Sequence, residues 1–240
     1  DNYLTNLTWG PNSEFIYVAE LNRKQNHMKL VKYNAFNGNR ISILFEEKND
    51  KWVEPEHELF FLAGKEDQFL WLSERDGFMN FYLYNTEGNL LKKVTSNSWV
   101  STAILGYNQK TNTLYYTGTG TDPKNMHAFS VSLNDDVGKQ ITEGNGIHNC
   151  KLSPNSDYLL DIHSSIDKGP VVNCITLRKN KLNQIHKAKN PLLNFNIATT
   201  ELITIKASDG TNLEGRIIKP SNIKKNKKYP VLVYVYGGPH

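Results

Sequence analysis

The sequence predicts a mostly β chain: about four blades of a larger β-propeller, followed by the first strands of a second domain of α/β type. Three observations predict this fold. A unit of about 45 to 54 residues repeats, turn residues divide each unit into short strands, and no 11-residue window keeps helical apolar spacing. Aromatic residues make up 11% of the chain, which also favours strands. We expect the propeller at residues 1–195 and the second domain at residues 196–240.

The repeat is clearest in two segments, residues 9–20 (WGPNSEFIYVAE) and 152–163 (LSPNSDYLLDIH). Each is typical of a strand end, a Pro-Asn-Ser turn and a second strand that begins at an aromatic residue. Two further units fit between them. A second strand is therefore expected to start once per unit, near Phe15, Phe69, Thr113 and Tyr158.

Each unit is expected to contain four strands. In the second unit they are predicted at residues 59–63, 69–74, 80–85 and 90–95, and in the third at 101–107, 114–118, 127–133 and 139–142. Turns in the second unit are expected at residues 65–67, 75–77 and 87–88. Four short strands at this period are typical of propeller blades. A closed ring of four blades is the rarer alternative to part of a larger propeller.

The repeat ends near residues 190–196, and a different pattern follows. Residues 201–205 and 213–218 flank an Asp209-Gly210 turn and predict a hairpin. The apolar run Val231–Val235 then predicts a strand over residues 229–236 that is buried on both faces. If no further strand paired with it, this strand would leave an apolar edge exposed. We therefore expect the rest of the protein or a neighbouring molecule to cover that edge. This strand would deliver Tyr236 into a Gly-Gly-Pro-His loop, the kind of place where α/β enzymes hold reactive groups.

Composition excludes several classes of function. The net charge is +4, from 28 basic and 24 acidic residues, and the basic run Lys224–Lys228 is interpreted as a solvated loop. We therefore expect no nucleic-acid partner. No apolar segment reaches the roughly 18 residues that span a bilayer, and no signal peptide is visible at the start.

The two cysteines are expected to be free thiols. Cys150 and Cys174 would lie on the first and third strands of one sheet, about 9–10 Å apart, which exceeds the reach of a disulfide. The histidines and cysteines are dispersed along the chain, so neither a metal nor another cofactor is implied.

The C-terminal motifs carry a family resemblance. Residues 207–210 (ASDG), 213–220 (LEGRIIKP) and 229–240 (YPVLVYVYGGPH) resemble the opening of the catalytic domain in the prolyl oligopeptidase clan of serine peptidases. A propeller directly upstream is also that clan's architecture. Residues 73–84 and 94–99 look like blade segments of the dipeptidyl peptidase IV branch. Tyr236 points to the same branch, because the acylaminoacyl-peptidase branch typically has histidine there. The resemblance covers essentially the whole chain.

The resemblance implies a serine exopeptidase with an eight-bladed β-propeller and an α/β-hydrolase domain. Such a parent removes dipeptides after proline or alanine from peptides with a free N-terminus, through a serine ester. It also implies that Tyr236 donates its hydroxyl to the oxyanion, a role that suits a neutral phenol held by a rigid strand. By analogy with the family, we expect a homodimer that acts outside the cytoplasm.

The motif of the nucleophile is absent from these 240 residues, since no Gly-x-Ser-x-Gly occurs. We therefore expect the chain to be an inactive fragment of the peptidase, with the triad and the amine-binding glutamates elsewhere. The pair Glu46-Glu47 is interpreted as solvated.

Trp52 and Glu54 are candidate substrate-binding residues that would line the central cavity, and inter-blade packing is their alternative role. The acylaminoacyl-peptidase or oligopeptidase branch, or a propeller that binds without catalysis, remain alternative functions.

Overall fold

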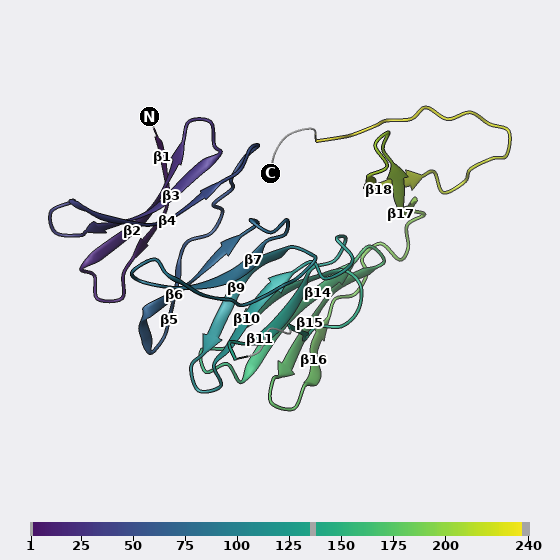
Figure 1. Ribbon diagram of the computed structural model, residues 1–240. Helices are drawn as coiled ribbons and strands as arrows, with labels where there is room; N and C mark the ends of the chain where they lie inside the picture. The colour runs from purple at the N-terminus through teal and green to yellow at the C-terminus, as the bar shows by residue number, and fades with distance from the viewer. Residues whose placement is uncertain (1, 135–137, 237–240) are drawn as a thin grey trace. The chain divides into compact units, whose positions relative to one another are not determined.

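The computed structural model describes residues 2–134 and 138–236, and these contain strands and turns but no helix. The chain divides into two compact units, Asp1–Ala188 and Lys189–His240, which are described separately. Within the described part of the first unit, four antiparallel four-stranded sheets follow one another (Figure 1). The strands of each sheet pair in chain order, which is the meander of a propeller blade.

The four sheets are called blades 1 to 4. Blade 1 contains β1 (Asn2–Trp9), β2 (Phe15–Asn22), β3 (His27–Asn34) and β4 (Arg40–Lys48). Blade 2 contains β5 (Phe60–Leu62), β6 (Lys65–Ser73), β7 (Asn80–Asn85) and β8 (Leu90–Lys93). Blade 3 contains β9 (Ser101–Asn108), β10 (Thr113–Gly118), β11 (His127–Ser132) and β12 (Lys139–Gln140). Blade 4 contains β13 (Ile147–Leu152), β14 (Tyr158–Ser165), β15 (Lys168–Thr176) and β16 (Lys181–Lys187).

The mostly β fold made of four-stranded blades is therefore confirmed. Second strands start at Phe15, Thr113 and Tyr158 as predicted, but β6 starts at Lys65 rather than near Phe69. The predicted turn at residues 65–67 is wrong. Gly64, with a φ of 75°, makes a tighter turn directly after Leu62, so the charged residues that follow belong to the strand.

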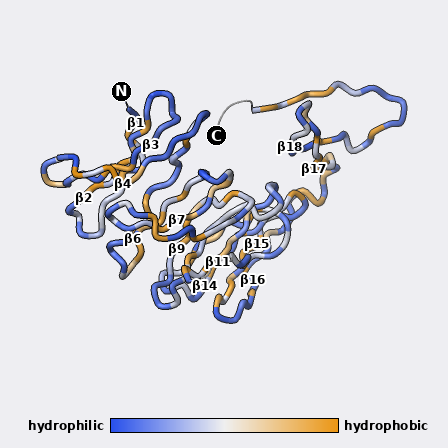
Figure 2. The backbone as a smooth tube through the Cα atoms, in the orientation of Figure 1, coloured by the Kyte–Doolittle hydropathy of each residue, from blue (hydrophilic) through white to orange (hydrophobic). Residues whose placement is uncertain are grey.

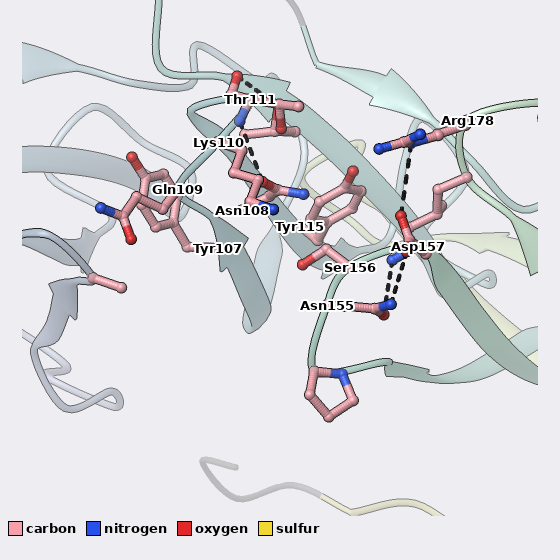
Figure 3. A pocket seen from close by; sticks show the side chains of 14 residues that line it. Tyr107, Asn108, Gln109, Lys110, Thr111, Tyr115, Asn155, Ser156, Asp157 and Arg178 are labelled. Atoms are coloured by element: carbon pink, nitrogen blue, oxygen red, sulfur yellow. Dashed lines mark hydrogen bonds and ion pairs between the residues drawn. The ribbon is translucent and has the colours of Figure 1, made fainter.

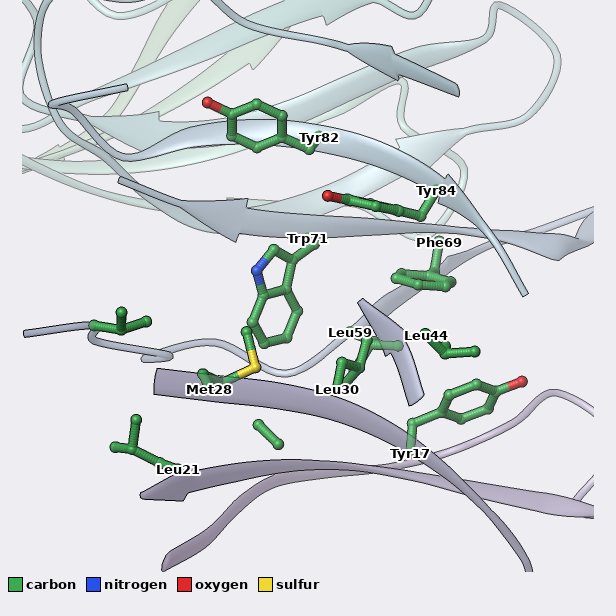
Figure 4. Packing of buried hydrophobic residues seen from close by; sticks show 12 residues of the cluster. Tyr17, Leu21, Met28, Leu30, Leu44, Leu59, Phe69, Trp71, Tyr82 and Tyr84 are labelled. Atoms are coloured by element: carbon green, nitrogen blue, oxygen red, sulfur yellow. The ribbon is translucent and has the colours of Figure 1, made fainter. Parts of the chain in front are cut away.

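Alternating side chains on β6 and β7 join blade 2 to both of its neighbours. Its aromatic face packs on blade 1, and the residues of blade 2 in that core are Phe69, Trp71, Tyr82 and Tyr84 (Figure 4). Its other face packs on blade 3 through Leu70, Leu72, Phe81 and Leu83. Because side chains alternate along a strand, one pair of strands supplies both cores. Apolar segments accordingly run through the interior of the blades (Figure 2).

Aromatic rings dominate the core between blades 1 and 2. The ring of Phe45 from β4 stacks on Tyr84 with centroids 4.3 Å apart, and the ring of Phe69 stacks on Tyr84 at 5.8 Å. Phe45 also meets the Trp71 ring edge-on at 5.7 Å. Such pairs add about 0.5–1.5 kcal/mol each beyond the apolar area they bury.

The joint between blades 3 and 4 is partly polar. His148 of β13 is buried, and its Nδ1 lies 2.9 Å from Oδ1 of Asp161 on β14. Asn173 of β15 donates to the other carboxylate oxygen at 3.1 Å. The His148 ring also stacks between two other imidazoles, 5.0 Å from His127 of blade 3 and 4.1 Å from His163.

Both cysteines are free, as predicted. Cys150 lies on β13 and Cys174 on β15, with β14 between them in the sheet. Cys150 is buried among the side chains at the joint with blade 3, whereas Cys174 is half-buried. Burial and the nearby Asp161 carboxylate raise the pKa of the Cys150 thiol to about 12, so it stays a protonated, apolar core group.

The second unit contains the predicted hairpin, β17 (Thr199–Lys206) and β18 (Asn212–Lys219). Its turn places Gly210 at a φ of 88°, which glycine adopts without steric cost.

The strand predicted over residues 229–236 is wrong for this structure, because residues 229–236 form no strand. The side chains of Val231–Tyr236 are all at least 73% exposed. A continuous apolar run becomes a buried strand only between partner strands, and β17 and β18 pair only with each other. The Gly-Gly-Pro-His motif at residues 237–240 lies outside the described residues.

The Asp161 carboxylate gives the joint of blades 3 and 4 a predicted pH dependence. Burial alone would raise its pKa, but hydrogen bonds from His148 and Asn173 outweigh burial and lower that pKa. A lowered folded-state pKa stabilises the fold above the unfolded value of about 3.9, and this contribution is lost as the pH falls through the folded-state pKa. Asp161→Ala should cost about 3–5 kcal/mol at pH 7, measured by calorimetry of the full-length protein.

The difference between wild type and Asp161→Ala should narrow below about pH 4. Asp157→Ala, which removes an exposed carboxylate from the same blade, should change stability little at any pH. A constant difference between wild type and Asp161→Ala from pH 7 to pH 2 would contradict this role.

Candidate functional site

A small pocket lies where the connection from β4 to β5 meets the turn between β6 and β7. Its volume is about 210 Å³. Its lining comes from the end of blade 1, the first residues of the connection and the turn of blade 2: Glu46, Glu47, Lys48, Asn49, Trp52, Val53, Glu74 and Arg75. The pocket therefore lies at one end of the joint between the first two blades.

Backbone hydrogen bonds hold the connecting loop against blade 1. The Asn49 N–H donates to the Asn26 carbonyl at 3.0 Å, and the Val53 N–H donates to the Gln25 carbonyl at 2.7 Å. Val53 is buried in the core between blades 1 and 2. The preceding residue, Trp52, is thereby left on the pocket side with 51% of its surface exposed. An exposed indole on an anchored loop is available to a ligand.

Glu47 is the polar centre of this pocket. The Trp71 indole N–H donates to its Oε1 at 2.8 Å, and the Ser73 hydroxyl donates to its Oε2 at 3.0 Å. The Arg75 guanidinium forms an ion pair with the same carboxylate. The interpretation of Glu46-Glu47 as a solvated pair is therefore wrong for Glu47, whose side chain is only 11% exposed.

The Arg75 guanidinium is fixed on several sides. Besides Glu47, it donates to the Tyr84 hydroxyl, and its Cζ lies 4.3 Å from the centroid of the Tyr82 ring. Burial alone would lower the pKa of Arg75, but the Glu47 charge and the Tyr84 hydroxyl raise it above its ordinary value. The group is a permanent, immobilised cation at the pocket wall.

Glu46 lies at the more exposed rim. Hydrogen bonds from His27 and Lys48 lower the pKa of Glu46 to about 2, so it is ionised at neutral pH. No serine, cysteine or histidine is among the described residues that line the pocket. It therefore offers an aromatic surface and fixed charges, which suit binding rather than nucleophilic chemistry.

The three residues predicted from sequence lie in different settings. Trp52 lines the pocket, whereas the half-buried Glu54 does not. Tyr236 belongs to the second unit, where it is 73% exposed at the end of the described residues. The roles assigned to all three stay predictions.

Sequence reasoning missed Glu47 and Arg75. One signal for Glu47 was available: Phe45 stands two residues earlier on the same strand, so the two side chains share a face. Phe45 packs on Trp71 of blade 2, which places Glu47 toward blade 2 as well. For Arg75 the sequence indicated only the turn, which the Gly77 N–H to Glu74 carbonyl bond of 2.7 Å closes. No feature of the sequence indicates that the Arg75 side chain extends back across the sheet.

The described residues hold no group of three or more His, Cys, Asp or Glu side chains arranged for a metal ion. Within the same residues, no helix could span a membrane.

Comparison with known proteins identifies the family of this chain. A family model described as the dipeptidyl peptidase IV (DPP IV) N-terminal region matches residues 1–170. The chain belongs to this family. The matched region contains blades 1 to 3 and the first two strands of blade 4, together with the whole Trp52 pocket.

Solved structures give the same result for the fold. A putative dipeptidyl aminopeptidase IV from Bacteroides ovatus is 33% identical, with a TM-score of 0.91, and the match covers 100% of this chain and 37% of that one. The dipeptidyl peptidase 4 of Porphyromonas gingivalis is 21% identical, with a TM-score of 0.78 over 93% of this chain and 32% of its own.

Curated relatives are less similar in sequence than the Bacteroides ovatus protein. The dipeptidyl peptidase 4 of Trichophyton tonsurans is 24% identical over 91% of this chain, and the dipeptidyl peptidase 8 of Mus musculus is 23% identical over 99%. The chain spans about a third of their length, 29% and 33% respectively.

The carboxylate of Glu47 should be a stabilising group of this joint. Glu47→Gln keeps the size of the side chain but removes the charge that Trp71, Ser73 and Arg75 contact. We expect a loss of about 1–3 kcal/mol in the free energy of unfolding. Glu46→Gln, at the exposed rim, is the matched control and should change stability little. Equal effects in urea titrations of the two full-length variants would argue against a central role for Glu47.

Proposed function

We propose that the parent of this chain is a serine exopeptidase that removes N-terminal dipeptides, after proline or alanine, by acyl transfer through a serine ester. The observation that carries the proposal is the family match over residues 1–170. The 33% identity to the Bacteroides ovatus protein over the whole chain supports it. Peptides with a free N-terminus would be the substrates. By analogy with the family, the parent would be a homodimer outside the cytoplasm.

In this proposal the two units contribute different parts. Residues 196–240 would open the α/β-hydrolase domain, and the hydroxyl of Tyr236 would donate a hydrogen bond to the oxyanion of the tetrahedral intermediate. The nucleophile and its triad would come from the parent outside these residues, because no Gly-x-Ser-x-Gly occurs among them. The 240 residues alone would therefore be inactive.

The propeller would position and filter peptides. Trp52 offers an exposed ring on an anchored loop, beside the fixed Glu47–Arg75 pair. Such a surface would bind the apolar and polar parts of a peptide without reacting with it, and its rigidity would lower the entropic cost of binding. Glu54, on the same loop, would also contact the peptide.

A substrate comparison tests the function. The full-length protein should hydrolyse a Gly-Pro or Ala-Pro p-nitroanilide with a free amino group and should lose this activity when the amino group is acetylated. A pocket that pairs with an ammonium loses its charge partner on acetylation. Activity on acetylated substrates alone would support an acylaminoacyl-peptidase instead, and no hydrolysis of either form would support a propeller that only binds.

Tyr236→Phe tests the oxyanion role in the full-length protein. Removing one donor to the oxyanion should lower kcat by about 10- to 1,000-fold while KM changes much less, because the bond forms mainly in the transition state. Tyr234→Phe is the matched control from the same exposed segment and should leave kcat near the wild-type value. An unchanged kcat for Tyr236→Phe would exclude the assigned role.

A further inference from the structure

A larger cavity lies at the opposite end of the strands from the Trp52 pocket. Its volume is about 660 Å³, and turns of blades 3 and 4 surround it (Figure 3). Strand β6 of blade 2 runs between the two sites. Ala63, before the start of β6, lines the cavity, whereas Glu74, after the end of β6, lines the Trp52 pocket. The two sites are therefore separated by the length of a strand.

Two hydroxyl groups on largely buried residues open onto this cavity. Tyr115 of β10 is 9% exposed and Ser156, in the turn between β13 and β14, is 7% exposed. Neither hydroxyl forms a hydrogen bond with the part of the chain that the structure describes. The neighbouring Tyr107 differs, since its hydroxyl donates to Oδ1 of Asn112 at 2.6 Å. Because both hydroxyls are open to the cavity and are not used within the described chain, both can donate a hydrogen bond to a molecule bound there.

The charges around these hydroxyls favour an anion. Lys110, at the tip of the turn between β9 and β10, makes no ion pair with the described residues and lines the cavity. Arg178 lines the other side, with only its Nε near a carboxylate, 3.7 Å from Oδ1 of Asp157. In Figure 3 the Tyr115 ring stands between these two cations, with its hydroxyl toward the open space.

Asp157 does not cancel this preference. Its carboxylate already accepts a hydrogen bond from the Asn155 side chain at 2.7 Å and pairs with Arg178. Burial and the charge of Asp157 raise the pKa of Tyr115, so the phenol stays protonated at neutral pH and remains a donor. Two cations and two hydroxyl donors around one cavity suit a planar or tetrahedral oxyanion.

The groove between blades 1 and 2 provides an internal comparison. It lies at the same end of the strands, and its charged lining residues are Glu14, Glu66, Asp67 and Lys32. Three carboxylates and one ammonium group would repel an anion. The cationic character of the cavity between blades 3 and 4 is thus a property of its own side chains and not of blade packing in general.

We propose that this cavity binds a small molecule through a carboxylate or phosphate group, with Tyr115 and Ser156 as hydrogen-bond donors and Lys110 and Arg178 as charge partners. The site is separate from the proposed peptidase function. Its occupation does not depend on whether the parent is a peptidase.

Ligand titrations of the full-length protein at constant ionic strength test the site. Inorganic phosphate and citrate are titrated in separate series by calorimetry, with sodium chloride as the control anion. Saturable binding of phosphate identifies the phosphate class, and saturable binding of citrate identifies the carboxylate class. Absence of saturation with both anions overturns the proposal.

Two pairs of variants locate the binding. Tyr115→Phe should raise Kd at least about tenfold, because it removes a hydrogen bond to a charged group, whereas Tyr158→Phe, outside the cavity, should leave Kd unchanged. Lys110→Gln should likewise weaken binding, and Lys151→Gln, an exposed lysine of blade 4, should not. Thermal melts of each variant report folding. Equal Kd values for a variant and its control, with both folded, would place the anion elsewhere and reject the site.

Discussion

Burial of both faces of each sheet between its neighbours is the constraint on which the first unit depends. A four-stranded sheet with two apolar faces is stable in water only when both are covered. Blade 2 meets this condition, with aromatic side chains toward blade 1 and aliphatic ones, with Phe81, toward blade 3. The outermost blades keep exposed apolar residues, among them Leu4 and Leu7 of β1 and Ile185 of β16. A propeller with more blades would bury such residues, in agreement with the larger parent that we propose.

The same constraint explains how polar groups are arranged in the joints. A carboxylate between two sheets loses hydration, so it persists only with several donors around it. Glu47 has the indole of Trp71, the hydroxyl of Ser73 and the guanidinium of Arg75. Asp161 has His148 and Asn173. Each set of donors fits only one placement of the strands around it, so these carboxylates help to define how those strands pack.

The sequence predicted the parts of the fold that local patterns control. Alternation of apolar residues and turn chemistry located the strands of blades 2 and 3 and the hairpin around Gly210, because both depend on residues that are adjacent in sequence. Two of the errors have a non-local cause. Residues 229–236 are apolar enough for a buried strand, but burial depends on partner strands that the pattern does not supply. The interpretation of Glu47 as a solvated residue was wrong for a similar reason. The hydrogen-bond donors to its carboxylate come from another blade, 24 to 28 residues away in the sequence.

Sites on this unit follow from the same geometry. Where two sheets pack face to face, their strand ends diverge into turns, and a groove opens at the joint. A few turn residues therefore decide what each groove can bind. Acidic residues line the groove between blades 1 and 2, whereas Lys110 and Arg178 flank the cavity between blades 3 and 4. At the other end of the strands, an anchored loop presents Trp52 instead. Turn residues lie outside the cores, so they can change without disturbing the packing that holds the blades together. One propeller scaffold can therefore carry chemically different sites at successive joints.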